Sequence, residues 1–168
     1  MRRRRVHVHG LRASKHVHGQ CRFEQWQRRF PFRQRRLGPP ADRNVAYGNS
    51  VHGFGLYAVS DIISSHDEAT ANGGFGFSLF QTASSAFTHD VSQDNEHGFV
   101  AARSNGNGFS HDVANHNRGY GFLVYDGSSG NTVEQSVAHG NLYADAADFT
   151  NAGANAWMSN SFGTTLLP

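Results

Sequence analysis

The sequence predicts an all-β solenoid, because a short polar frame returns at a nearly constant interval and a strand-like stretch follows each copy. In one copy, Asp90 is followed five residues later by Asn95 and then by Gly98 and Phe99. The second Asn of the frame recurs at intervals of 23, 23, 22, 24 and 19 residues, at Asn49, Asn72, Asn95, Asn117, Asn141 and Asn160. A fixed period of about 20–50 residues indicates a solenoid or a related array.

The residues that follow each Gly-Phe pair alternate in character, which is typical of a β-strand. Phe77 and Leu79 fall on one side of such a strand, and Phe99 and Ala101 do the same one copy later. Two further apolar positions flank the acid of the frame. They are Phe87, Phe109 and Val133 three residues before it, and Val91, Val113 and Val137 directly after it. We therefore expect about three short strands in each coil, separated by polar bends.

The six asparagines of the frame are expected to form a ladder. One coil cannot bury its own apolar side, but coils stacked about 4.8 Å apart bury a common core and bring equivalent residues over one another. An Asn side chain carries both a donor and an acceptor, so each can bond to the next along the stack and to the backbone of its bend.

Composition favours many short strands and turns in a single domain. Of the 168 residues, 38% are hydrophobic, 17% are charged and 19 are Gly. The single Cys21 excludes an internal disulfide. No apolar run is long enough for a transmembrane helix, and we find neither a secretory signal peptide nor a twin-arginine leader. The sequence leaves the compartment and the oligomeric state open.

The chain divides at residue 43 into two different materials. Residues 1–43 hold 13 of the 15 Lys and Arg and two acids, a net charge of about +11, whereas residues 44–168 carry a net charge of about −9. The frame is absent from residues 1–43. We interpret this segment as a poorly ordered basic arm, or as the product of a wrong start site or frame slip. Nucleic-acid binding through its basic and aromatic residues is a less favoured alternative.

The repeats resemble those of the right-handed parallel β-helix family, as in pectin-lyase-like proteins. The frame carries the resemblance, and residues 155–164 look like a last coil in which Trp157 and Phe162 close the open end. The resemblance covers residues 44–168 and implies a right-handed parallel β-helix of about five to six coils. It also implies a carbohydrate-facing role, a secreted or cell-surface location, and a place as the C-terminal part of a longer β-helix.

The reaction, if there is one, does not follow from this resemblance, since the family includes polysaccharide lyases, hydrolases, isomerases, phage tailspikes and repeat proteins without known chemistry. An acidic column is the main candidate for chemistry. His-Asp pairs recur one coil apart and end in Asp67, Asp90 and Asp112. They suggest an acid/base site for an acidic glycan, with His89 or Arg103 assisting and with calcium as the cofactor of a lyase. Alternatively, the acids are turn residues, which Ser136 in the fifth copy favours.

Aromatic residues on the strand after Gly-Phe suggest a second kind of site. Tyr57, Phe80 and Tyr125 are candidates for stacking on sugar rings, and packing under a neighbouring loop is the alternative. Two functions therefore stand. The first is a binding or structural module for a polysaccharide, with no cofactor and no assigned metal ligand. The second is a polysaccharide lyase or hydrolase.

Overall fold

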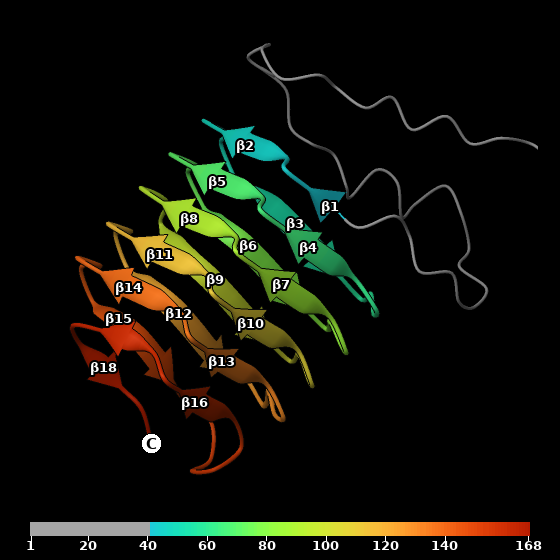
Figure 1. The fold of residues 1–168 in the computed structure, drawn as a ribbon, viewed down its shortest axis with the longest axis vertical. Coiled ribbons are helices and arrows are strands. Elements are labelled where there is room, and N and C mark those ends of the chain that lie inside the picture. Colours follow the sequence, from blue (N-terminus) through green and yellow to red (C-terminus); the bar gives the residue numbers. More distant parts are fainter. Residues whose placement is uncertain (1–40) are drawn as a thin grey trace, which may run out of the picture.

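The computed structural model describes residues 41–168, which form a stack of parallel β-coils (Figure 1). Eighteen short strands lie in three sheets of six strands, and every pairing is parallel. Each coil contributes one strand to each sheet, so the expected three strands per coil are confirmed. The prediction for residues 1–43 lies outside the described residues, except that the first strand already begins at Ala41. No helix in the described part of the chain has the length and hydrophobicity to span a membrane.

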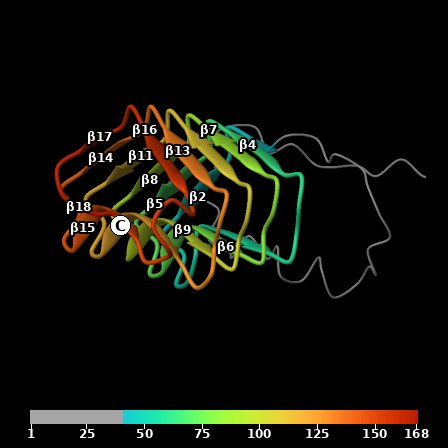
Figure 2. The ribbon, with the colours of Figure 1, turned by 90° about the horizontal axis from the view of Figure 1, so that it is seen from below.

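The strands run around a common axis in the order sheet A, sheet B, sheet C (Figure 2). Sheet A contains β1 (Ala41–Asp42), β4 (Ile63–Ser65), β7 (Ala86–Thr88), β10 (Gly108–Ser110), β13 (Thr132–Glu134) and β16 (Ala156–Met158). Sheet B contains β2 (Val45–Tyr47), β5 (Glu68–Thr70), β8 (Val91–Gln93), β11 (Val113–Asn115), β14 (Val137–His139) and β17 (Ser161–Phe162). Sheet C contains β3 (Phe54–Tyr57), β6 (Phe75–Phe80), β9 (His97–Ala102), β12 (Tyr120–Tyr125), β15 (Ala144–Asp148) and β18 (Thr165–Leu166).

The core consists of stacked phenylalanines from sheets A and C. Phe77, Phe99 and Phe122 of sheet C stack with ring centroids 4.6 and 5.0 Å apart. Phe87 and Phe109 of sheet A stack at 5.1 Å and meet the sheet C column edge to face. Each such aromatic pair contributes about 0.5–1.5 kcal/mol beyond the burial of its area. The repeat therefore keeps Phe at these positions because identical rings pack against one another from coil to coil.

Sheet B turns its smallest residues inward. Val91, Val113 and Val137 lie on its outer side, half-buried, while the next residue in each strand points into the core. These inward residues are the small Ala69, Ser92, Ala114 and Ala138, all fully buried. Because the two phenylalanine columns already fill the interior, the third side of the coil has room only for small side chains.

The last coil is covered by aromatic side chains, as the sequence suggested. Trp157 and Phe162 pack edge to face at 6.1 Å, and Phe162 lies 5.8 Å from Phe122 of the core column. The indole Nε1 of Trp157 also donates to Asp148, 3.1 Å away, which fixes the orientation of the ring.

Candidate functional site

An asparagine column runs along the bend between sheets B and C, as predicted for five of the six residues. The backbone N–H and the side-chain Nδ2 of Asn72 both donate to Oδ1 of Asn95 at 2.9 Å. Nδ2 of Asn95 in turn donates to the backbone carbonyl of Ala69 at 2.9 Å. The same pattern joins Asn49, Asn72, Asn95, Asn117 and Asn141. The side-chain amides of this column and the backbone N–H groups of the same residues are thereby paired, as buried polar groups require.

Asn160 does not belong to this column, contrary to the prediction. Its Oδ1 accepts from the backbone N–H of Ser136 at 2.9 Å, so Asn160 continues the acidic column. The asparagine column ends instead on Asp145, whose Oδ1 accepts from the backbone and side-chain nitrogens of Asn141 at 3.1 and 2.7 Å. The spacing carried this information, because Ser136 and Asn160 are separated by 24 residues whereas Asn141 and Asn160 are separated by 19.

A further asparagine column follows the bend between sheets C and A and was missed in the sequence. The backbone N–H of Asn107 donates to Asn131, and that of Asn131 to Asn155, both at 3.0 Å. Asn155 therefore belongs to this column and not to the acidic column. The signal was the interval of 24 residues between members, but only three coils carry Asn here and Ser85 takes the position in the coil before.

The acidic column lies at the bend between sheets A and B and is fully buried. Asp67 is 1% exposed, and Asp90 and Asp112 are 0% exposed. One carboxylate oxygen of each accepts from the backbone N–H one coil earlier. The N–H of Asn44 donates to Asp67 at 2.7 Å, that of Asp67 to Asp90 at 2.7 Å, and that of Asp90 to Asp112 at 2.8 Å. These carboxylates have the contacts of turn residues and almost no surface exposed to solvent.

The second oxygen of two of these acids has no partner. Oδ2 of Asp67 accepts from the hydroxyl of Ser64 at 2.8 Å, but Oδ2 of Asp90 and Oδ2 of Asp112 accept no hydrogen bond. Desolvation by burial raises the pKa of Asp90 to about 6, despite hydrogen bonds that act in the opposite direction. Burial likewise raises the pKa of Asp112 well above its usual value. The ionised form of both acids is therefore destabilised in the fold.

Asn160, in the same column, shows which hydrogen bond is missing at the unpartnered oxygens of Asp90 and Asp112. Its Nδ2 donates to the backbone carbonyl of Val133 at 2.9 Å. The strand register places the carbonyl of Ser64 in the equivalent position relative to Asp90, and that of Phe87 relative to Asp112. A carboxylate oxygen cannot donate to a carbonyl, whereas a protonated acid can.

The structure does not bring the other proposed catalytic residues to this column. His89 is exposed on the outside of the bend between sheets A and B, where it stacks with the neighbouring histidines. Arg103 follows sheet C, where its Nε lies 2.7 Å from Asp126 and its guanidinium covers the ring of Phe80. No group of three or more His, Cys, Asp or Glu within residues 41–168 is placed to hold a metal ion.

The predicted aromatic residues lie on the outer side of sheet C. The register places Tyr57, Phe80, Ala102 and Tyr125 in one line along the axis. Tyr57 and Phe80 stack with ring centroids 5.3 Å apart, and Tyr57 is 53% exposed. Tyr125 is half-buried against Leu123 and other apolar residues of the sheet. We call Tyr57, Phe80 and Tyr125 the aromatic face.

A second aromatic line on sheet C was not predicted. His52, Phe75, His97 and Tyr120 contact one another in sequence, with ring centroids 4.7, 5.1 and 5.4 Å apart. Nδ1 of His52 accepts from the backbone N–H of Phe75, and Nδ1 of His97 from that of Tyr120. Together with Tyr125, Phe75 and Tyr120 cover a buried cluster of Val100, Leu123 and Ala147. Mixing His with Phe and Tyr hides the repeat from a search for identical residues.

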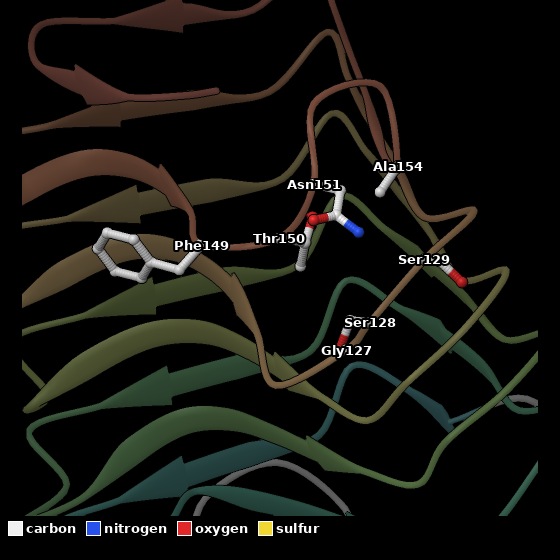
Figure 3. A pocket seen from close by; sticks show the side chains of 7 residues that line it. All are labelled: Gly127, Ser128, Ser129, Phe149, Thr150, Asn151 and Ala154. Atoms are coloured by element: carbon white, nitrogen blue, oxygen red, sulfur yellow. The ribbon is translucent and has the colours of Figure 1, made fainter.

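A shallow cavity of about 270 Å³ lies at the bend after β12, beside the segment that joins β15 to β16. The cavity is lined by four polar residues, Ser128, Ser129, Thr150 and Asn151, and by Gly127, Phe149 and Ala154 (Figure 3). Asp148 holds this segment in place by accepting from the backbone and hydroxyl of Thr150 at 3.0 and 2.6 Å. The cavity is smaller than most small-molecule sites and contains no charged side chain.

Three-stranded coils, in-register stacking and polar ladders at the bends define a parallel β-helix. The family model described as a right handed beta helix region matches residues 19–166, and the chain belongs to that family. The predicted fold is thereby confirmed. The match also begins inside residues 1–43, where the frame could not be found. No curated protein and no solved structure matches the chain significantly.

Proposed function

We propose that this chain is a carbohydrate-binding β-helix domain that holds a polysaccharide along the outer side of sheet C without cleaving it. The stacked pair of Tyr57 and Phe80 carries the proposal. A large aromatic side chain that is half exposed, as Tyr57 is, leaves apolar area in contact with water. The C–H faces of a sugar ring cover such an area while the sugar hydroxyls remain hydrated.

The geometry of the line supports a chain ligand that runs along the axis. Tyr57 and Phe80 are one strand spacing apart, about 4.8 Å, and Tyr125 lies two spacings beyond Phe80, with Ala102 between them. The adjoining ion pair of Arg103 and Asp126 lies on the exposed surface and offers both donors and acceptors to sugar hydroxyls. A rigid sheet presents these groups with little loss of conformational entropy, which favours binding.

Burial of the acidic column supports binding rather than hydrolysis or elimination. General acid/base catalysis requires a carboxyl group within hydrogen-bonding reach of the substrate. Asp67, Asp90 and Asp112 lie inside the coil and are occupied by backbone N–H groups. The proposal therefore includes neither a catalytic residue nor calcium.

Affinity electrophoresis in gels that contain a neutral or an acidic polysaccharide tests this function. The double variant Tyr57→Ala/Phe80→Ala is expected to lose at least about tenfold in affinity. Tyr47→Ala is the matched control, because Tyr47 is 60% exposed but lies on sheet B. Equal retention of the wild type and the double variant would sink the proposal. Release of new reducing ends or unsaturated products would establish an enzyme instead.

A further inference from the structure

We propose that Asn105 is a site of spontaneous deamidation in the folded protein and that Ser129 activates it. Three asparagines of the chain are followed by Gly, namely Asn72, Asn105 and Asn107. In such a pair the backbone nitrogen of the Gly can approach and attack the side-chain amide, because no Cβ shields it. The structure separates the three pairs from one another, and the inference stands whether or not sheet C binds a polysaccharide.

Two of the three asparagines are protected by the asparagine columns. Asn72 and Asn107 are 0% and 1% exposed. The Nδ2 of each, which is the leaving group of deamidation, donates to a backbone carbonyl and to the next Asn of its column. Water reaches these amides only when the coil opens, and opening of a packed core costs a large part of the free energy of unfolding. Both pairs should therefore react slowly in the fold.

Asn105 lies outside the columns, on the bend between β9 and β10. It is exposed, and its Nδ2 donates no hydrogen bond within residues 41–168. The space around Gly106 is open, since a Cβ built there meets no atom within 4 Å. The N–H of Gly106 donates to the carbonyl of Ser129 at 3.0 Å, but both residues are exposed, so water can replace this bond. Opening of the bend alone therefore frees the attacking nitrogen.

Ser129 polarises the side-chain amide of Asn105. The backbone N–H and the hydroxyl of Ser129 donate to Oδ1 of Asn105 at 2.8 and 3.0 Å. Attack on the amide carbon moves negative charge onto this oxygen, and donors that already face the oxygen stabilise the charge as it develops. Among the three Asn-Gly pairs, only Asn105 combines a polarised carbonyl with an exposed leaving group.

The reaction consumes water and needs no other reactant. The backbone nitrogen of Gly106 gives up its proton and forms a bond to Cγ of Asn105, while the bond from Cγ to Nδ2 breaks and ammonia leaves with that proton. A cyclic imide remains. Water then adds to one of its two carbonyl carbons, and the bond from that carbon to the nitrogen breaks. Cleavage at Cγ gives Asp, and cleavage at the backbone carbonyl carbon gives isoaspartate. The net change converts an amide and water into a carboxylic acid and ammonia, without oxidation or reduction.

The two products differ in how they fit the bend. Asn105 forms parallel bridges with Ala83 in the coil before and with Ser129 in the coil after. A carboxylate at the same position accepts the bonds from Ser129 as the amide did. Isoaspartate lengthens the backbone by one carbon, so the bridges to the two neighbouring coils cannot both keep their register. The aspartyl form should therefore be as stable as the original protein, and the isoaspartyl form less stable.

Incubation of the full chain at mildly alkaline pH tests the inference. Mass spectrometry of proteolytic peptides, with fragment ions that separate residue 105 from residue 107, measures the rate at each position. In the folded protein, Asn105 is expected to deamidate at least about tenfold faster than Asn72 or Asn107. The same protein unfolded in urea is the internal reference. There the three rates should converge, because each Asn is followed by Gly and no structure protects it.

Variants complete the test. Ser129→Ala removes the hydroxyl but keeps the backbone N–H, and it should slow the reaction of Asn105 by about two- to tenfold. Ser84→Ala is the matched control, since the bond from Ser84 to Asn105 comes from its backbone N–H, at 3.1 Å. Asn105→Asp should melt like fresh wild type, whereas wild type aged until isoaspartate accumulates should melt at a lower temperature.

The inference is overturned if the three asparagines react at similar rates in the folded protein, or if Asn72 or Asn107 reacts first. It is also overturned if Asn105 reacts as fast in Ser129→Ala as in Ser84→Ala. Thermal melting before incubation confirms that both variants are folded.

Discussion

The two polar columns on either side of sheet B use the same geometry with different atoms. In both, a side-chain oxygen accepts from the backbone N–H of the preceding coil, as Asn95 does from Asn72 and Asp90 from Asp67. The asparagine column adds an Nδ2 that donates to a buried carbonyl, whereas Asp90 has an oxygen without a partner at that place. Asn and Asp side chains have the same shape and both support the bend. The carboxylate oxygen that takes the place of the amide nitrogen makes the acidic column sensitive to pH.

Removing a member of the asparagine column should have the largest effect. In Asn95→Ala, the buried N–H of Asn72 loses its acceptor and the carbonyl of Ala69 loses a donor. We expect the free energy of unfolding to fall by roughly 3–5 kcal/mol, since each unpaired buried group costs about 1–3 kcal/mol. Urea denaturation measures the change. Asn105→Ala, at an exposed bend, is the control and should cost less than about 1 kcal/mol. Similar losses in both variants would contradict the role of the column.

Replacing Asp90, the central acid of the acidic column, should raise the free energy of unfolding at neutral and alkaline pH. The folded pKa of Asp90 lies above its unfolded value, so its contribution to stability is complete below about pH 4 and is lost as the pH rises through about 6. Between about pH 5 and pH 8 the wild type should therefore lose roughly 1–2 kcal/mol of stability.

Asp90→Asn should flatten this pH dependence and stabilise the protein by roughly 2 kcal/mol at about pH 8. Urea titrations at the two pH values measure both changes. Asp145 determines how far the pH can be lowered in these urea titrations before a second carboxyl group changes the stability. Burial favours a higher pKa for Asp145, but hydrogen bonds from Asn141 and Thr164 outweigh it and hold this pKa below its usual value, so its contribution disappears only under more acidic conditions. Greater stability of the wild type at about pH 8 than at about pH 5 would refute this account of the acidic column.

The asparagine column also has a glycine packed closely beside it. A Cβ on Gly98 would collide with the carbonyl of Gly121 and press on Ala114 and Nδ2 of Asn117. Gly98→Ala is therefore expected to destabilise the protein by about 1–3 kcal/mol through overpacking. Gly108→Ala is the control, because a Cβ there meets no atom within 4 Å. Equal melting temperatures of the two variants would show that the asparagine column does not need a glycine beside it.

The smallest effect is expected at the end of the acidic column. Asn160→Asp removes the bond from Nδ2 to Val133, but Asn160 is only half-buried and water can replace the lost partner. A loss below about 1 kcal/mol, with little dependence on pH, would show that burial gives Asp90 its sensitivity. A loss as large as the alkaline penalty of Asp90 would assign the effect to the column itself.

Much of the fold was predictable because stacking forces equivalent residues to recur. The interval between asparagines gave the coils, and the alternation at Phe77 and Leu79 gave the core strands of sheet C. The assignment of Asn160 to the ladder was wrong because residue identity was followed where the spacing from Ser136 pointed to another column. The sequence does not show which side of sheet B faces inward, because only the packed phenylalanines reveal that there is no room for valine.

The site was less predictable than the fold for a physical reason. Asp and Asn form the same bends, so the sequence cannot tell a buried carboxylate from an exposed one, and the depth of Asp90 follows from the positions of its neighbours. The pairing of Arg103 with Asp126 likewise depends on two coils being in register. The aromatic line through His52, Phe75, His97 and Tyr120 was hidden because different rings serve the same contact.

In all three columns the backbone N–H of the bend donates to a side-chain oxygen that lies later in the sequence. The acceptor is 22 to 24 residues away, except at Asn141, where it is Asp145. Translation releases the earlier residues first, so the newest coil leaves the ribosome before its acceptors have been synthesised. Each coil is completed by its successor, and co-translational folding of this protein should trail synthesis by one coil, at a distance set by the repeat length.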